Sequence, residues 1–142
     1  MPNHCHNRVT VYSANTHDVA KIKQMFEDEN CFTQIIPEPD CPNTPNDKGE
    51  IPVKHEDPWL TYRFADGKAD DRWYDWRVQN WDTKWDCYDV EVTDDDPECT
   101  EIQFNTAWSP PEAICHALRE QYPDVSISWF YDEPGCEIAG YL

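Results

Sequence analysis

The feature that most constrains this fold is a change of hydrophobic period, from two to about 3.6, at both ends of the chain. Residues 5–13, CHNRVTVYS, alternate with Val9 and Val11 on one face, which predicts a strand with one buried side. Residues 15–29 follow as a predicted helix with Asn15 or Thr16 as its N-cap. Its apolar positions fall on one stripe: Val19, Ile22, Met25 and Phe26.

Residues 100–108 predict a second alternating strand. Ile102, Phe104, Thr106 and Trp108 share one parity, so we expect Trp108 to face the core and to join the sheet to the following helix. On that basis Trp108→Ala would cost about 3–5 kcal/mol of stability.

A second helix is predicted over residues 109–123, with Ser109 as N-cap, Pro110 at the first helical position and Glu112 completing a capping box. The expected apolar stripe is Ile114, Ala117, Leu118 and Tyr122. Residues 125–133 and 136–142 then predict two more strands on either side of the turn sequence EPG.

The middle of the chain loses this periodicity. Six prolines between residues 31 and 59 argue against a regular helix or a central strand there, and we expect one short extended piece around residues 32–36. Residues 72–80 predict a short amphipathic helix, after which Trp81 and Trp85 lie on an irregular segment leading to a strand at 87–92.

This order of elements is βα, an irregular insert, then βαββ. Split β-α-β folds of the ferredoxin-like type have such an order, with two helices on one face of an antiparallel sheet. We therefore predict an α+β fold in which residues 1–142 form a single ferredoxin-like domain. Residues 31–98 form its acidic insert, rich in proline and tryptophan.

The charge balance restricts the partners. The chain has 11 Lys and Arg against 29 Asp and Glu, a formal charge of −18. No basic stretch exists that could neutralise phosphates, which argues against direct binding to nucleic acid or to an anionic membrane. Basic proteins, cations and proteins that normally hold nucleic acid fit this charge, and solubility in a salt-rich habitat is the other explanation.

Seven cysteines, an odd number without a C-x-x-C pair, form neither a zinc-knuckle pattern nor a secreted disulfide framework. The N-terminal sequence lacks the apolar core of a secretion signal, and no stretch approaches the length of a membrane span. We therefore expect a cytoplasmic protein with mostly free thiols and no cofactor.

Residues 73–89, WYDWRVQNWDTKWDCYD, hold the candidate site. Its tryptophans suit a core, a stacking platform or a partner surface. Arg77 has two interpretations: an internal contact, with Asp75, Asp86 or a tryptophan ring, or a site for a small anionic ligand. The candidate ligand or partner residues are Trp73, Trp76, Arg77, Asn80, Trp81, Lys84 and Trp85.

Other chemistry is weakly indicated. If Met1 were removed, the amine of Pro2 together with His4 could wrap Cu²⁺ or Ni²⁺, and His6 lies nearby, but burial of the first strand would block this, so we predict no metal site. Cys115 and His116 should point in different directions on their helix. Because no catalytic triad, phosphate loop or carboxylate pair emerges, the sequence leans away from an enzyme.

Several motifs resemble the YubB-type ferredoxin-like domain family of phages and plasmids (Api92-like proteins). They are MPNHCHNRVTV, IIPEP, WYDWRVQNWDTKWD and FNTAWSPP, in the family's order. His4 stands where the family has Trp, and Asp82 where it has Gly, so either residue 82 does not need a positive φ or Asp tolerates one there. The resemblance implies the fold and a mobile-element context, and no reaction.

These observations lead to two functional hypotheses. The first is a small acidic accessory protein of a phage or plasmid that binds a host or defence protein, one that normally holds nucleic acid. The second is a binder of a small anionic ligand, or an enzyme, that uses a tryptophan-lined pocket with Arg77, Asn80 and Lys84.

Overall fold

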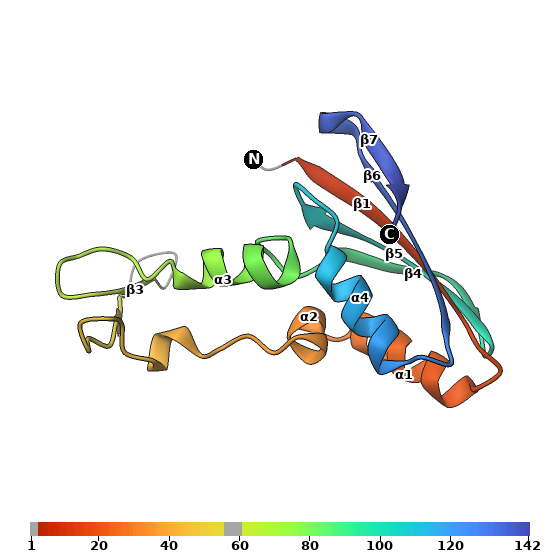
Figure 1. The fold of residues 1–142 in the computed structure, drawn as a ribbon, viewed down its shortest axis with the longest axis horizontal. Coiled ribbons are helices and arrows are strands. Elements are labelled where there is room, and N and C mark those ends of the chain that lie inside the picture. The colour runs from red at the N-terminus through yellow and green to blue at the C-terminus, as the bar shows by residue number, and fades with distance from the viewer. Residues whose placement is uncertain (1–2, 56–60) are drawn as a thin grey trace.

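The computed structural model describes residues 3–55 and 61–142 (Figure 1). Its main sheet has five antiparallel strands in the order β4-β5-β1-β6-β7. The strands are β1 (His4–Tyr12), β4 (Tyr88–Asp96), β5 (Cys99–Ala107), β6 (Ser126–Glu133) and β7 (Ile138–Tyr141). The helices are α1 (Thr16–Glu27), α2 (Cys31–Ile35), α3 (Arg72–Trp81) and α4 (Glu112–Gln121), with short 3-10 turns η1 (Cys41–Asn43) and η2 (Pro134–Cys136).

The strand order identifies the fold class. β1 lies between β5 and β6, so the units β1-α1-β4 and β5-α4-β6 interleave as two split β-α-β motifs. β7 adds one strand at the edge beside β6. The predicted α+β, ferredoxin-like architecture is confirmed. Among the described residues no helix has both the length and the apolar character needed to cross a membrane.

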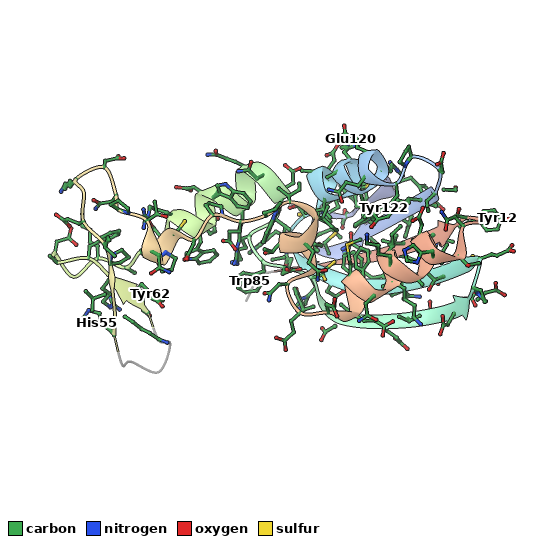
Figure 2. All side chains as sticks on the ribbon, turned by 90° about the horizontal axis from the view of Figure 1, so that it is seen from below. Tyr12, His55, Tyr62, Trp85, Glu120 and Tyr122 are labelled. Atoms are coloured by element: carbon green, nitrogen blue, oxygen red, sulfur yellow. The ribbon has the colours of Figure 1, made fainter. Side chains whose placement is uncertain are left out.

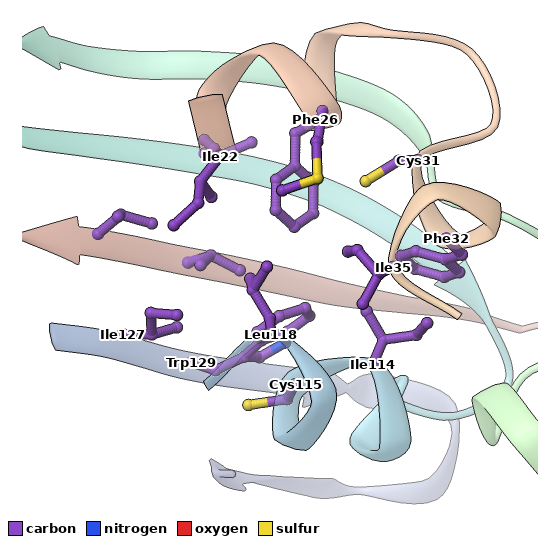
Figure 3. Close-up of a cluster of buried hydrophobic side chains, with 14 of the residues drawn as sticks. Ile22, Phe26, Cys31, Phe32, Ile35, Ile114, Cys115, Leu118, Ile127 and Trp129 are labelled. Carbon is purple, nitrogen blue, oxygen red and sulfur yellow. The ribbon is translucent and has the colours of Figure 1, made fainter. Parts of the chain in front are cut away.

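The core lies between one face of the sheet and the helices (Figure 3). Val9 is paired with Ile102 on one side and with Trp129 on the other, and all three are fully buried. The stripe predicted for α1 packs against this face, and Asn15 caps the helix by accepting a hydrogen bond from the Asp18 amide at 3.3 Å. The N-terminal strand and helix are therefore as predicted.

The start of α4 differs from the prediction. The helix begins at Glu112, and neither Ser109 as N-cap nor Pro110 as the first helical residue is correct. A proline disfavours helical backbone in the residue before it, so Pro111 keeps Pro110 out of the helix. The cap comes from a distant residue instead, because the amide of Ala113 donates to the carboxylate of Asp82 at 2.9 Å.

The segment after α1 is also different. The extended piece expected at residues 32–36 is the helix α2, which follows Asn30 in the left-handed conformation at φ 62°. The short helix buries Cys31, Phe32 and Ile35, a three- and four-residue spacing that one turn brings to one side. With only five residues, this helix is too short for its period to be recognised in the sequence.

Trp108 does not face the core, so that prediction is wrong. β5 ends at Ala107, and Trp108 adopts a left-handed backbone with φ 70°, which ends the alternation that buries Ile102, Phe104 and Thr106. Its side chain is 47% exposed. The predicted cost of about 3–5 kcal/mol for Trp108→Ala, which assumed full burial, no longer applies.

Residues 36–55 and 61–81 are hereafter called the arm: the first part leaves the end of α2 and runs away from the sheet, and the second part returns along α3 (Figure 1). A small hairpin of β2 (Val53–Lys54) and β3 (Tyr62–Arg63) lies toward its outer end, and Trp85 lies near its junction with the sheet (Figure 2). The predicted insert of residues 31–98 thus also contains α2, which packs in the core, and β4, which is a strand of the main sheet.

Candidate functional site

Helix α3 carries most of the predicted site residues and joins the arm to the core. It extends one residue beyond the prediction, so Trp81 is helical and not on an irregular segment. Trp81 is fully buried, donates its indole N–H to the Ile36 carbonyl at 3.0 Å, and meets the rings of Phe32 and Trp76 edge-on. Trp81 and the partly buried Trp76 therefore pack with the hydrophobic core.

Arg77 forms an internal ion pair, but with a partner that the sequence did not indicate. Its guanidinium donates two hydrogen bonds to the Glu38 carboxylate, at 2.8 and 2.9 Å, rather than to Asp75 or Asp86. The same guanidinium lies 5.1 Å from the ring centres of both Trp73 and Trp81, so the predicted stacking on tryptophan is confirmed. This arrangement ties α3 to the outgoing half of the arm.

The structure does not bring Arg77, Asn80 and Lys84 to a common cavity. The Asn80 amide donates to the Trp76 carbonyl at 2.8 Å within α3, and Asn80 lines neither cavity described below. The Lys84 ammonium lies 4.4 Å from the ring centre of Trp85, a side chain that is 37% exposed. Arg77 and Lys84 line two different cavities.

The larger cavity, hereafter the arm cavity, lies between the two halves of the arm and has a volume of about 790 Å³. Aromatic side chains of Tyr62 and Trp73 line it together with Arg77. Four carboxylates also line it: Glu38, Asp40, Asp70 and Asp71. Such a lining favours a cationic group that can also contact an aromatic ring.

Two of these carboxylates have cationic partners. Asp70 is nearly buried and pairs with the Arg72 guanidinium at 2.8 Å, which holds the pKa of Asp70 below its ordinary value. Glu38 is paired with Arg77. Asp40 and Asp71 form no ion pair with any residue of 3–55 or 61–142, so the arm cavity retains an excess of negative charge.

Arg72 also holds the arm together. Its guanidinium donates to the backbone carbonyls of Cys41, Thr44 and Pro45, besides pairing with Asp70. The local pattern D-D-R gave no sign of this role, because the carbonyls lie 27 to 31 residues earlier in the chain. These hydrogen bonds of Arg72 therefore hold the two halves of the arm together beside the arm cavity.

The segments on either side of the arm meet at Asp86. Its carboxylate accepts hydrogen bonds from the amides of Phe32, at 3.1 Å, and of Cys87, at 2.8 Å. Burial raises the pKa of Asp86, and these hydrogen bonds oppose the shift. The Cys31 thiol lies against that of Cys87, and this contact and burial raise the pKa of Cys31.

The thiols do not suggest a catalytic nucleophile. All seven cysteines are free thiols, as the sequence predicted for most of them. Burial raises the pKa of Cys5 and of Cys115 to about 11, so both are protonated at neutral pH. Cys115 is buried whereas His116 is exposed beside Glu112, which confirms that the two side chains diverge.

The weak metal candidates His4 and His6 lie on the open face of the sheet, opposite the helices. The His4 imidazole contacts the Tyr88 hydroxyl at 2.5 Å, and His6 lies between the amide oxygens of Gln103 and Asn105. Within the described ranges no group of three or more His, Cys, Asp or Glu is arranged to hold a metal. The amine of the proposed copper wrap lies outside the described residues.

Sequence reasoning missed a second cavity at a neighbouring face of α3, with a volume of about 280 Å³. Tyr74, Val78 and Trp108 line it, and each is more than two-fifths exposed. The spacing of Tyr74 and Val78, four residues apart on a predicted helix, was a signal that could have placed them on one side. The approach of Trp108 depends on the tertiary fold.

Comparison with known proteins identifies the C-terminal part of the chain. Residues 80–142 match the family model described as the ferredoxin-like domain in Api92-like protein. These residues, which make up less than half of the chain, are similar to that domain. The match covers the last two residues of α3 and all of the chain from β4 to β7, so β1, α1 and almost all of the arm lie outside it. No curated protein and no solved structure matches the chain.

The family match includes part of the motifs identified in the sequence. NWDTKWD and FNTAWSPP fall within the matched Api92-like domain. Asp82 adopts φ 64°, so of the two alternatives considered for this position, aspartate in the left-handed conformation is the one that the structure shows.

Proposed function

We propose that this protein is a small acidic accessory protein of a phage or plasmid that works in the cytoplasm by binding a basic host or defence protein. The partner is a protein whose basic groove normally holds nucleic acid. The observation that supports this proposal is the arm cavity, where four carboxylates and two aromatic rings surround a space of about 790 Å³. A lysine or arginine side chain of the partner enters this space.

The charges of the cavity favour a cation over an anion. Arg77 already forms two hydrogen bonds with Glu38, so an anionic ligand would have to compete with a paired carboxylate. A cation instead meets Asp40 and Asp71, together with the ring of Trp73. The formal charge of −18 adds long-range attraction, which speeds encounter with a basic partner.

The test is capture of partners from a host lysate at low and at physiological ionic strength, with and without an excess of duplex DNA. We expect captured proteins that are released both by salt and by DNA, because nucleic acid competes for the same basic groove. Asp40→Asn with Asp71→Asn should reduce capture several-fold, since both charges lie at the cavity and neither is needed for an ion pair.

The matched control is Asp94→Asn with Asp96→Asn, which removes the same net charge at the far end of β4. Capture should stay close to that of the wild type. Equal losses in the two double variants would assign the binding to net charge alone and contradict a role for the arm cavity. Failure to capture any partner, or capture that is indifferent to salt and DNA, would contradict the proposed function.

A further inference from the structure

Three large apolar side chains are exposed together beside α3. Tyr74, Val78 and Trp108, hereafter the apolar patch, are 44%, 41% and 47% exposed and line the cavity of about 280 Å³. Single exposed apolar residues are common on protein surfaces, but several around one cavity mark a contact surface. The patch combines one turn of α3 with the residue that follows β5.

The backbone of Trp108 is strained in a way that exposes its ring. A left-handed φ of 70° is unfavourable for a bulky residue, and the extended conformation would instead continue the inward alternation of β5. The conformation is held by the Trp108 amide, which donates to the Asn3 carbonyl at 2.9 Å, and by the Ser109 hydroxyl, which donates to the Asp82 carbonyl at 2.5 Å. The strained backbone of Trp108 therefore exposes its ring to solvent.

The size of the cavity restricts what enters it. Its volume of about 280 Å³ lies at the lower end of the range of roughly 300–1,000 Å³ that is usual for small-molecule sites. One apolar side chain of another protein fits this space. Aromatic side chains in such positions are the usual anchors of protein interfaces.

The charges around the apolar patch restrict the partner. Asp75 lies on α3 between Tyr74 and Val78, and Asp82 lines the cavity itself; both are exposed. The nearby ammonium of Lys84 lies over the ring of Trp85. A second copy of this chain would bring another formal charge of −18 to the same place, whereas a basic protein would complement it.

We propose that the apolar patch receives one apolar side chain of the basic partner, whose neighbouring lysines or arginines face Asp75 and Asp82. This inference rests on the proposed function and adds a second contact on a different face of α3 from the arm cavity. The arm cavity supplies charge recognition, and the apolar patch supplies the desolvated anchor of the interface.

The test uses a synthetic helical peptide with leucines at helical spacing and lysines elsewhere, and measures its affinity by fluorescence anisotropy. Two comparison peptides replace the leucines by alanine or the lysines by glutamine. The wild type should bind the leucine–lysine peptide at least about tenfold more tightly than the alanine–lysine peptide. Trp108→Gly should abolish this ratio, and Trp85→Ala, which alters an exposed tryptophan outside the cavity, should retain it.

Stability provides the second readout. Glycine accepts a positive φ, so Trp108→Gly should melt within a few degrees of the wild type or above it. A fall in Tm of more than about 10 °C would assign the ring to the fold and overturn the proposal. If that variant does not fold, Val78→Ser, at an exposed position of α3, should reduce the same peptide ratio, and an unchanged ratio would overturn it as well.

The peptide comparison separates the two proposals. Equal binding of the leucine–lysine and alanine–lysine peptides would contradict the apolar patch as an anchor and would still agree with a basic partner. If the leucine–lysine and leucine–glutamine peptides bind equally and both depend on Trp108, the result would contradict a basic partner and would still agree with the apolar patch as an anchor. A dimer in light scattering that Trp108→Gly dissociates would replace the basic partner by a second copy, and so overturn the occupant proposed here.

Discussion

Asp82 makes two separable contributions to stability, and substitutions at this position should distinguish them. Its backbone occupies the left-handed region at φ 64°, where alanine costs about 1–2 kcal/mol more than glycine. Its carboxylate also accepts the Ala113 amide at the start of α4, at 2.9 Å. Loss of such a cap costs about 1 kcal/mol.

The two contributions predict an order of stability. Asp82→Ala loses the cap and places an unfavourable residue in the left-handed region, so it should lose about 2 kcal/mol. Asp82→Gly loses only the cap and should lose about 1 kcal/mol. Asparagine tolerates the left-handed backbone and keeps an oxygen that can accept the Ala113 amide, so the stability of Asp82→Asn should stay within about 0.5 kcal/mol of that of the wild type.

The assay is thermal unfolding followed by far-UV circular dichroism. A chain of 142 residues has an unfolding entropy of about 0.3 kcal/mol/K, so 2 kcal/mol corresponds to about 7 °C in Tm. We expect Tm values about 7 °C lower for alanine, about 3 °C lower for glycine and nearly unchanged for asparagine. Glycine as destabilising as alanine would refute the backbone contribution, and alanine equal to the wild type would refute both.

Three further predictions follow from the same structure. Trp81→Ala removes a fully buried indole at the junction of arm and core, so it should cost about 3–5 kcal/mol of stability and lower Tm by at least about 10 °C. Trp85→Ala, at a partly exposed position, should change Tm little. Similar Tm shifts for both variants would contradict the assignment of Trp81 to the core. The Arg72 guanidinium lowers the pKa of Asp70, so this pair stabilises the fold above about pH 4, and its contribution is lost as the pH falls through the lowered pKa. The Tm of Asp70→Asn should therefore fall less on acidification than the Tm of the wild type. Parallel curves of Tm against pH for the two proteins would disprove this. Because 18 net negative charges repel one another, Tm should rise between about 10 and 150 mM NaCl, and a steady fall would indicate a surface stabilised by specific ion pairs.

The regular part of the fold was readable from the sequence because its periodicity is a local property. Val9 and Val11, or Ile102 and Phe104, face the core since successive strand residues alternate, whatever the rest of the chain does. The same holds for the stripe of α1 from Val19 to Phe26. These patterns, with the order of the elements, were sufficient for the ferredoxin-like class.

The candidate site was only partly predictable. The sequence placed Trp73, Trp76 and Arg77 on a helix, and it offered a stack of Arg77 on a tryptophan ring as one of several alternatives. It could not name Glu38 as the partner, because Glu38 and Arg77 are 39 positions apart in the chain and most of the residues between them have no regular period. The arm cavity exists only because the two halves of the arm lie side by side, and its carboxylates come from two separate stretches of the chain, residues 38–40 and 70–71.

Trp108 and Asp82 illustrate the limit most clearly. Strand parity assigned Trp108 to the core, and the capping-box pattern assigned the start of α4 to Ser109; both rules assume that the local conformation continues unchanged. In the folded chain Trp108 takes a left-handed backbone, and Asp82, from the end of α3, provides the cap that Ser109 does not. The sequence by itself determined the strands of the main sheet, the helices α1, α3 and α4, and the buried faces of β1, β5 and α1, since those depend on neighbouring residues. Only the tertiary structure decided where α4 begins, what Arg77 binds and that Trp108 faces solvent, because these depend on contacts between residues far apart in the chain.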